Sequence, residues 1–227
     1  MRLSVIIPVY NERELFPALL RKVQAVNIEK EIIVVDNCST DGTRQLIEEL
    51  ADDSMQVILQ PENYGKGTSV RTGIQRARGD FLIIQDADLE YDPEDYHKLL
   101  AVADPVEKPV VYGTRLRADS GNVHKRTAFY FGRVHLTTLF RFLYRSNITD
   151  VSTCYKLIRT DLAQSLNLKG CSFDLDFEVG AKIRRKGYQI HEVPISYHPR
   201  SVGEGKKIRV WDGVVAIWTL LKYRFVD

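Results

Sequence analysis

The chain has 227 residues, of which 44% are hydrophobic, and its 32 basic and 30 acidic residues leave a formal charge of +2. This length supports one large globular domain or two small ones, and the small net charge excludes nucleic acid as the default partner, because nucleic-acid binders concentrate basic residues. The three cysteines show no C-x-x-C spacing, so we expect no disulfide framework, no zinc site and a reducing, cytosolic setting.

The first half of the chain alternates apolar runs with amphipathic stretches. The runs lie at 3–10, 31–37, 55–61 and 80–86, and the stretches with helical spacing lie at 14–26, 43–52 and 69–79. This alternation predicts parallel strands joined by crossover helices, and hence an α/β sheet covered on both faces. The first apolar run is too short for a signal peptide or a membrane span, so we expect the chain to fold in the cytoplasm.

Polar residues follow three of the predicted strands. They are Tyr10, Asn11 and Glu12 after the first strand, Asp36 and Asn37 after the second, and Asp86 and Asp88 after the fourth. Open α/β sheets bind ligands beyond the carboxyl ends of their strands. We therefore expect these side chains to share one crevice.

The sequence "QDADLE" places two aspartates at the end of an apolar run. At positions i and i+2 of a strand, Asp86 and Asp88 would point to the same side, and two close carboxylates favour a cation between them. A hard divalent ion completed by substrate phosphates, Mg²⁺ or Mn²⁺, suits such oxygens, and Glu90 is a candidate third ligand. The letters alone are weak support, because Asp174 and Asp176 form a second D-x-D.

Two other nucleotide sites are disfavoured. The turn "PVYNERE" contains no glycine, which a dinucleotide-binding fold would need, and "NYGKGTS" lacks the spacing of a P-loop. For Lys66 two readings stay open: a surface turn that opens a helix, or a phosphate or sugar contact at that helix start.

The second half is less regular. Residues 120–149 contain no acidic side chain and interleave basic with aromatic residues, which suits either an amphipathic helix in a membrane interface or an ordinary helix packed on the sheet. A strand pair, or a strand and a helix, is expected over 150–187. Near the C-terminus Trp211 and Trp218 flank an apolar run that is too short to cross a bilayer.

Several motifs together carry a family resemblance. They are "VIIPVYNE" (5–12), "IIVVDNCSTDGT" (32–43), "NYGKGTSVRTGIQRARGD" (63–80), "QDADLEYDPED" (85–95), "YGTR" (112–115), "DVSTCYKLIR" (150–159), "FEVGAKIRRKGYQIHEVPISYHPRSVGEGKK" (177–207) and "WDG" (211–213). In order and spacing the chain resembles family 2 glycosyltransferases of the GT-A fold, and among them the polyprenyl-phosphate (dolichol-phosphate) mannose and glucose synthases. With no internal repeat, we expect a single domain: a nucleotide-sugar-binding half (1–118), an acceptor-binding half (119–207) and an apolar membrane-proximal tail (208–227).

The resemblance implies roles for individual residues on the donor side. The implied nucleotide-sugar contacts are Pro8, Tyr10, Asn11, Glu12, Asp36, Asn37, Asn63, Lys66, Gly67, Asp86, Ala87 and Asp88. Asp36 has an alternative role as a helix cap. The implied ligands of Mn²⁺ or Mg²⁺ are Asp88, Asp86 and Glu90, and related enzymes often carry glutamine at the Glu90 position.

Other residues are implied on the acceptor side. The basic residues expected to meet phosphates are Arg115, Arg126, Arg133, Arg200 and Lys206, with Arg133 a rival to Arg126. Asp150, Asp176 and Glu178 fall where the family carries acids near the acceptor. One of them would be the general base if the acceptor were a hydroxyl.

The implied reaction is inverting, metal-dependent transfer of a sugar, mannose from GDP-mannose being favoured, to a polyprenyl phosphate. The enzyme is expected at the cytoplasmic face of a membrane as a peripheral protein. Alternatives are a UDP-glucose or UDP-N-acetylglucosamine donor, or a saccharide hydroxyl as acceptor. Outside this class, a non-catalytic lipid- or nucleic-acid-binding protein would use only the basic aromatic stretch, and a phosphate-accepting signalling domain is disfavoured by the long second half.

Overall fold

A seven-stranded sheet forms the centre of the computed structural model, which describes residues 1–104, 107–116, 128–199 and 210–226. Its strands are β1 (Leu3–Val9), β2 (Lys30–Asp36), β3 (Met55–Leu59), β4 (Phe81–Ile84), β5 (Val110–Thr114), β6 (Lys156–Arg159) and β7 (His191–Pro194), in the order β3-β2-β1-β4-β6-β5-β7. Every neighbouring pair is parallel except those of β6, which runs antiparallel to β4 and β5. The prediction of a mostly parallel α/β sheet is confirmed.

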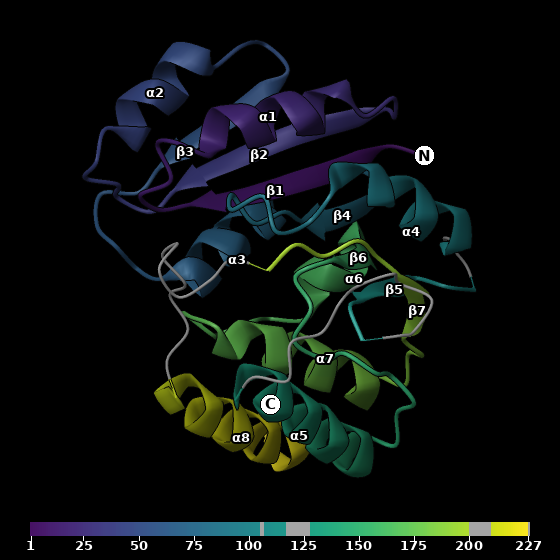
Figure 1. Ribbon diagram of the computed structural model, residues 1–227. Helices are drawn as coiled ribbons and strands as arrows, with labels where there is room; N and C mark the ends of the chain where they lie inside the picture. The colour runs from purple at the N-terminus through teal and green to yellow at the C-terminus, as the bar shows by residue number, and fades with distance from the viewer. Residues whose placement is uncertain (105–106, 117–127, 200–209, 227) are drawn as a thin grey trace.

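Helices cover both faces of the sheet (Figure 1). They are α1 (Phe16–Ala25), α2 (Thr43–Leu50), α3 (Lys66–Arg76), α4 (Tyr96–Val102), α5 (Ala128–Tyr144), α6 (Thr160–Ser165), α7 (Asp174–Arg185) and α8 (Val210–Phe225), with a 3₁₀ turn η1 at Pro93–Asp95. The sheet grows from β1 to β3 in one direction, whereas α3 returns the chain to β4 on the other side of β1. Because crossovers are right-handed, α3 lies on the face opposite α1 and α2.

The reversal of direction places a switch point between β1 and β4. All seven residues of β1 and all four of β4 are buried, as the continuous apolar runs of central parallel strands require. The loops leaving the carboxyl ends of these two strands diverge to opposite sides, which is the position where open α/β sheets bind ligands. The D-x-D turn follows β4 at this point.

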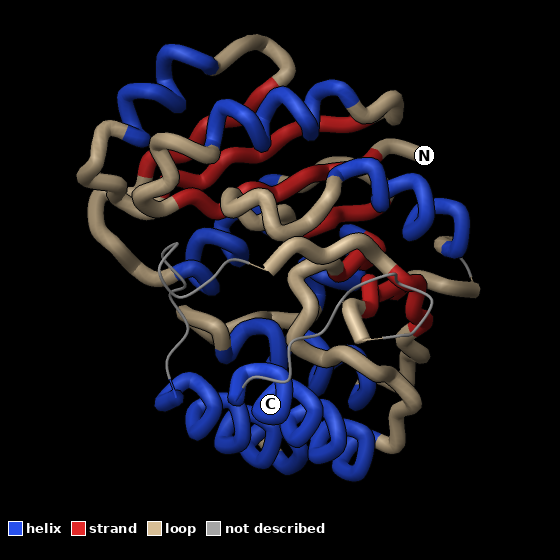
Figure 2. Tube along the Cα trace, in the orientation of Figure 1, coloured by secondary structure: helices blue, strands red, loops and turns tan. Residues whose placement is uncertain are grey.

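Three helices from the second half pack together on one side of the sheet, with α7 against the sheet core and α5 and α8 beyond it (Figures 1 and 2). Here α5 packs against α7 and α8 around a second apolar cluster, centred on Phe140, Phe177 and Leu220. The expected helix within 120–149 is therefore present, but it packs on other helices rather than on the sheet. No helix of the described residues is long and apolar enough to cross a membrane.

Helix α3 approaches β1 closely at Gly73. A methyl group at this position would lie 2.4 Å from Ile6 Cγ2, well inside van der Waals contact. Glycine is therefore required by the spacing between helix and sheet, and not by backbone conformation.

We expect Gly73→Ala to lower the free energy of unfolding by about 1–3 kcal/mol through overpacking, although alanine favours a helix over glycine. Gly132 on α5 is the matched control, since a methyl there meets no described atom within 4 Å outside its own helix. Gly132→Ala is expected to raise the stability by about 0.5–1 kcal/mol. Urea denaturation measures both, and equal effects at the two positions would contradict the close contact.

Candidate functional site

The loops after β1 and β2 are joined by hydrogen bonds at the switch point. The Asn11 N–H donates to Ser39 Oγ at 3.0 Å, and the Thr40 N–H donates to Asn11 Oδ1 at 2.8 Å. Asn11 has a φ of 52°, a left-handed conformation that asparagine adopts more readily than most residues. The structure therefore holds residues 10–12 against the loop that follows β2.

Asp36, the last residue of β2, is fully buried. Its carboxylate accepts hydrogen bonds from Arg44 Nε at 2.8 Å and from the Ser39 N–H at 3.2 Å. Helix α2 has Gly42 as its N-cap, so the alternative that Asp36 caps this helix is wrong. Instead the carboxylate fixes α2 to the loop through its arginine.

Two asparagines connect the end of β2 to the start of α3. Asn37 Nδ2 donates to Asn63 Oδ1 at 2.8 Å. The first turn of α3 then carries Lys66 and Gly67, and a side chain on Gly67 would lie 2.7 Å from the carbonyl oxygen of Gly170. The predicted donor residues of this segment are thus brought to the same edge of the sheet, with second-half backbone directly against the helix start.

Asp86 and Asp88 lie on a turn rather than on a strand. β4 ends at Ile84, and Leu89 has a left-handed φ of 59°. The prediction that strand alternation aims both carboxylates to one side is therefore wrong. Asp88 Oδ1 accepts a hydrogen bond from the Glu90 N–H at 3.2 Å, which fixes the turn from within.

One acid of each D-x-D motif is paired with a lysine. Lys66 Nζ lies 2.6 Å from Asp86 Oδ1, and Lys156 Nζ lies 2.5 Å from Asp176 Oδ1. Burial alone would lower the pKa of Lys66, but the charges of Asp86 and Asp176 raise it well above its usual value. Burial, reinforced by Asp86, raises the pKa of the neighbouring Cys154 thiol, so the cysteine is neutral here.

Lys156 is a site residue that the sequence analysis missed. Its side chain is fully buried in β6, and it also donates to the carbonyl oxygen of Thr153. A lysine inside the apolar run "CYKLI" was the available signal, because buried lysines need a partner. The identity of that partner, Asp176, depends on the tertiary structure.

Glu178 is fully buried and serves the loop before α7. Its carboxylate accepts from the N–H groups of Lys169 at 2.9 Å and Gly170 at 2.6 Å, and it forms an ion pair with Lys182 at 2.8 Å. These bonds hold the 169–170 backbone against α3. The structure therefore gives this predicted catalytic acid a supporting position.

Arg115 and Asp150 form a buried bidentate pair. Arg115 Nε and Nη2 donate to the two carboxylate oxygens at 2.7 and 2.8 Å, and Arg115 Nη1 donates to the Tyr91 hydroxyl at 2.9 Å. Burial alone would raise the pKa of Asp150, but the guanidinium lowers it below its usual value. The predicted phosphate-binding arginine thus holds a predicted catalytic acid.

Arg133 approaches this pair from α5. Its Nε is buried and has no hydrogen-bond partner among the described residues. Burial, followed by the nearby charge of Arg115, lowers the pKa of Arg133. The guanidinium carbon lies 5.9 Å from the centre of the Tyr197 ring. Burial raises the pKa of that tyrosine to about 12, so its hydroxyl is protonated and donates to Glu90 Oε2 at 2.9 Å.

The remaining predicted residues are placed as follows. Pro8 is buried within β1, Ala87 is buried on the D-x-D turn, and Arg126, Arg200 and Lys206 lie outside the described residues. In the described part of the chain no group of three or more His, Cys, Asp or Glu side chains forms a ready metal site. The hard oxygens of Asp86 and Asp88 nevertheless fit Mg²⁺ or Mn²⁺, which proteins often bind through one or two carboxylates and substrate phosphates.

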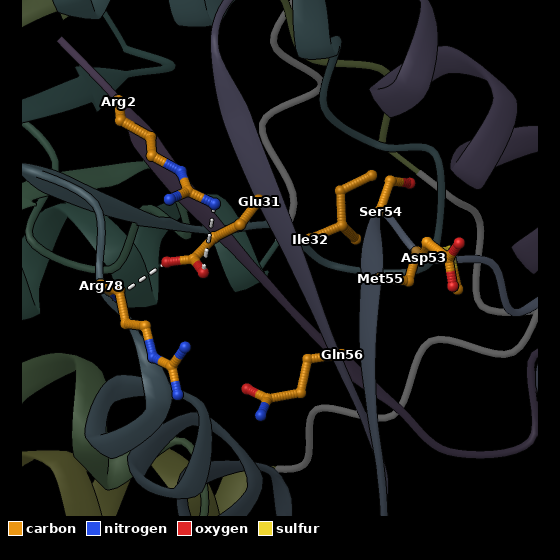
Figure 3. Close-up of a pocket in the computed structure, with 8 residues that line it drawn as sticks. All are labelled: Arg2, Glu31, Ile32, Asp53, Ser54, Met55, Gln56 and Arg78. Carbon is orange, nitrogen blue, oxygen red and sulfur yellow. Dashed lines mark hydrogen bonds and ion pairs between the residues drawn. The ribbon is translucent and has the colours of Figure 1, made fainter.

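A separate pocket opens at the amino ends of the strands (Figure 3). It is lined by Arg2, Glu31, Ile32, Asp53, Ser54, Met55, Gln56 and Arg78. Glu31 in this pocket is already engaged by the backbone N–H of Arg78 at 2.7 Å. None of the predicted site residues lies there, in keeping with ligand binding at the opposite, carboxyl edge.

Comparison with known proteins identifies the family. The model of the family described as "Glycosyl transferase family 2" matches residues 4–166. The chain belongs to this family. The resemblance inferred from the sequence motifs is therefore confirmed.

Two relatives of this chain are enzymes of polyprenyl-phosphate chemistry. An undecaprenyl-phosphate mannosyltransferase from Micrococcus luteus is 30% identical over 222 residues, which is 91% of this chain and 87% of the relative. An undecaprenyl-phosphate 4-deoxy-4-formamido-L-arabinose transferase from Proteus mirabilis is 37% identical over 134 residues, or 56% of this chain and 40% of the relative. The match therefore spans less than half the length of the Proteus enzyme.

Solved structures share the fold of this family member. Glucosyl-3-phosphoglycerate synthase from Mycobacterium tuberculosis, in complex with Mn²⁺, uridine diphosphate and phosphoglyceric acid, has a TM-score of 0.71 and 16% identity, covering 99% of this chain and 79% of that one. S. aureus TarS 1-349 with UDP-GlcNAc has a TM-score of 0.63 and 18% identity, covering 99% and 73%. At these identities the likeness shows the fold alone, and the predicted GT-A fold is confirmed.

We expect Asp150→Asn to lower the free energy of unfolding by about 3–5 kcal/mol at neutral pH, because it leaves the Arg115 charge buried without its counterion. The depressed pKa of Asp150 means that its contribution is complete above the unfolded pKa near ~3.9 and is lost as pH falls through the folded value. The difference between wild type and variant should therefore shrink in acid. Denaturant unfolding between pH 7 and pH 3 measures this.

The matched control is Asp161→Asn. Asp161 also pairs with an arginine, Arg159, at 2.6 Å, but its side chain is 67% exposed. Its loss should cost less than about 1 kcal/mol at any pH, since solvent screens exposed pairs. A loss at Asp150 as small as at Asp161, or one unchanged by acid, would contradict the buried pair.

Proposed function

We propose that this family member is an inverting, metal-dependent glycosyltransferase that moves a sugar from a nucleotide diphosphate to a polyprenyl phosphate, with mannose from GDP-mannose favoured. The observation that carries the proposal is the match to the Micrococcus luteus undecaprenyl-phosphate mannosyltransferase over 91% of this chain and 87% of that enzyme. UDP-glucose and UDP-N-acetylglucosamine are the alternative donors. We keep these donors as alternatives because S. aureus TarS, a structural neighbour, is solved in complex with UDP-GlcNAc.

The donor is assigned to the switch point. Residues 10–12, the Asp36 loop and the start of α3 surround the carboxyl ends of β1 and β2, where a nucleotide fits an open α/β sheet. Lys66 and the first turn of α3 supply positive charge for the diphosphate. Its ion pair with Asp86 keeps this lysine close to the D-x-D turn.

Asp88 and Asp86 are the residues proposed to hold Mg²⁺ or Mn²⁺, with Glu90 as a candidate third ligand. Carboxylate oxygens are the donors such hard ions prefer, and both side chains lie on the turn after β4. When bound, the ion neutralises negative charge on the departing diphosphate. The chain's own task is to hold the two carboxylates on a turn fixed by the Asp88–Glu90 hydrogen bond.

Arg133 is the residue that best fits the acceptor phosphate among those the structure describes. Its buried Nε without a hydrogen-bond partner carries a desolvation cost that an anion would offset. Arg115 lies close enough to lower the pKa of Arg133, while the charge of Asp150, the bidentate partner of Arg115, acts in the opposite direction. Its rival, Arg126, lies outside the described residues.

The candidate bases are poorly suited to a hydroxyl acceptor. Each of them forms an ion pair: Asp150 with Arg115, Asp176 with Lys156, and Glu178 with Lys182. The depressed pKa of Asp150 means that its carboxylate holds a proton weakly, which makes it a poor general base. A phosphate acceptor is already ionised near neutral pH and needs no strong base. The ion pairs therefore support a lipid phosphate over a saccharide hydroxyl.

One face of α8 is suited to a membrane surface. Its buried residues follow helical spacing toward α5 and α7, and large apolar side chains occupy the opposite face. The exposed residues are Trp211, Val214, Ile217, Trp218, Leu221 and Phe225. Aromatic residues with adjacent cations such as Lys222 favour the headgroup region. We assign this face to peripheral binding, at the cytoplasmic side.

Titration with GDP-mannose in the presence of Mn²⁺ is expected to raise the melting temperature of the protein, with UDP-sugars giving smaller shifts. Saturation at about 100 times the dissociation constant corresponds to about 2.7 kcal/mol of stabilisation. Differential scanning fluorimetry measures the shift, and a chelator should reverse the metal-dependent part. The absence of any shift with all three nucleotide sugars would contradict the proposed function.

Asp88→Ala should abolish both the metal-dependent shift and sugar transfer to undecaprenyl phosphate. The matched control is Asp174→Ala in the other D-x-D, where the carboxylate only accepts from the Ser172 N–H at 2.8 Å. This control should keep the ligand response despite some loss of helix stability. If Asp88→Ala kept full function, a non-catalytic lipid-binding protein would be the better explanation.

Leu221→Ser is expected to weaken binding to anionic phospholipid vesicles by roughly tenfold, the effect of about 1.5 kcal/mol of lost apolar burial. Leu50→Ser on α2 is the matched control, because the two leucines are 39% and 36% exposed. Co-sedimentation with vesicles measures the partitioning of each variant. Equal losses at the two positions would mean that α8 is not the contact face.

A further inference from the structure

The segment that follows β7 runs beside the D-x-D turn. The His198 N–H donates to the carbonyl oxygen of Glu90 at 2.8 Å, and Tyr91 and Tyr197 form an isolated antiparallel bridge. At its start, the Ile195 N–H donates to the carbonyl oxygen of Thr114 at 3.1 Å, which extends the pairing of β7 with β5. The backbone position of Tyr197 is therefore set from both sides.

The side chain of Tyr197 contacts two groups with different proposed tasks. Its hydroxyl donates to Glu90 Oε2 at 2.9 Å. Its ring centre lies 5.1 Å from the guanidinium carbon of Arg115 and 5.9 Å from that of Arg133. One rigid phenol thus lies between a carboxylate next to the metal-binding turn and the arginines next to the proposed acceptor phosphate.

We propose that Tyr197 is a positioning residue, whose hydroxyl orients the Glu90 carboxylate for the metal site while its ring orients Arg133 for the acceptor phosphate. The inference rests on the proposed function and adds a residue to it. Through this one side chain, Tyr197 sets the distance between the donor end of the site, at Glu90, and the acceptor end, at Arg133.

The hydroxyl has a clear effect on Glu90. A glutamate side chain has several rotatable bonds, and fixing it when a ligand arrives costs conformational entropy. A hydrogen bond to an ionised carboxylate holds it beforehand, as outer partners of metal ligands generally do. This hydrogen bond involves Glu90, an acid at a position where related enzymes often carry glutamine.

The ring has a different effect on Arg133. A guanidinium within about 6 Å of an aromatic face is attracted to it while keeping its N–H groups in plane for an anion. Tyr130 holds the same guanidinium at 5.9 Å from another ring. Two rings therefore restrain a cation whose buried Nε has no hydrogen-bond partner among the described residues.

The two contacts are separable by substitution. Tyr197→Phe removes the hydroxyl and keeps the ring, whereas Tyr197→Leu removes both. We expect Tyr197→Phe to weaken Mn²⁺ binding roughly tenfold in the presence of a nucleoside diphosphate, and to leave the KM for undecaprenyl phosphate unchanged. Tyr197→Leu should show the same metal defect and also raise that KM.

The experiment titrates Mn²⁺ against each purified variant by electron paramagnetic resonance, with GDP and separately with UDP. Tyr188→Phe is the matched control, because it removes a phenol hydroxyl from a half-buried tyrosine that is bonded to Arg184 through its backbone only. A cycle with Glu90→Gln tests whether Tyr197 acts through this carboxylate. The double variant should then bind Mn²⁺ no more weakly than Glu90→Gln alone.

The outcomes separate this inference from the proposed function. If wild type binds Mn²⁺ with a nucleotide but Tyr197→Phe binds it equally well, the positioning role is overturned and the proposed function stands. Two further results would overturn the positioning role as well. One is a double variant whose loss of Mn²⁺ affinity is the product of the two single losses. The other is a loss of Mn²⁺ affinity in Tyr188→Phe equal to that in Tyr197→Phe. If wild type binds no Mn²⁺ with either nucleotide, the proposed function fails and the inference with it.

Discussion

The ion pair between Lys66 and Asp86, at 2.6 Å, is the interaction on which the rest of the site depends. A parallel sheet brings the ends of its strands to one edge, and this chain places carboxylates there that repel one another and resist burial. Two of them are matched with cations: Asp86 with Lys66, and Asp176 with Lys156. Lys66 and Asp86 come from the first half of the chain and the other pair from the second, and the charge of Asp176 also acts on Lys66, so the two halves meet electrostatically at the site.

This pattern of pairing shapes the chemistry that the site can perform. A carboxylate held by arginine or lysine is a weak base, and Asp150 combines full burial with two short bonds to Arg115. By contrast, the guanidinium of Arg133 has a buried Nε that lacks a hydrogen-bond partner among the described residues. An excess of paired acids together with an under-paired guanidinium favours an acceptor that arrives already negative. The electrostatics and the names of the relatives thus both support the proposed phosphate acceptor.

Local sequence patterns predicted much of the fold but only part of the site. Continuous apolar runs determine β1, β2 and β4, because a central parallel strand must be apolar on both faces. The sequence analysis did not assign β5, and nothing local indicates that β6 enters the sheet antiparallel between β4 and β5. The prediction from strand alternation was wrong at Asp86 because β4 ends two residues earlier. Where a strand ends depends on the strands that pair with it more than on its own sequence. The support given by Glu178 to residues 169–170 is likewise set by tertiary contacts.

The two D-x-D motifs show how identical letters acquire different roles. Asp86 and Asp88 lie on a turn at the switch point, whereas Asp174 and Asp176 open α7, where acids at a helix start are favoured by the dipole whatever the function. Yet Asp176 is drawn to the site by Lys156, and Glu90 beside the first motif is bonded to Tyr197, 107 residues away. The role of an acidic residue here is thus decided by which cation or hydroxyl the fold brings to it. Sequence spacing proposes the candidates, and the partner that the fold brings to each acid distinguishes between them.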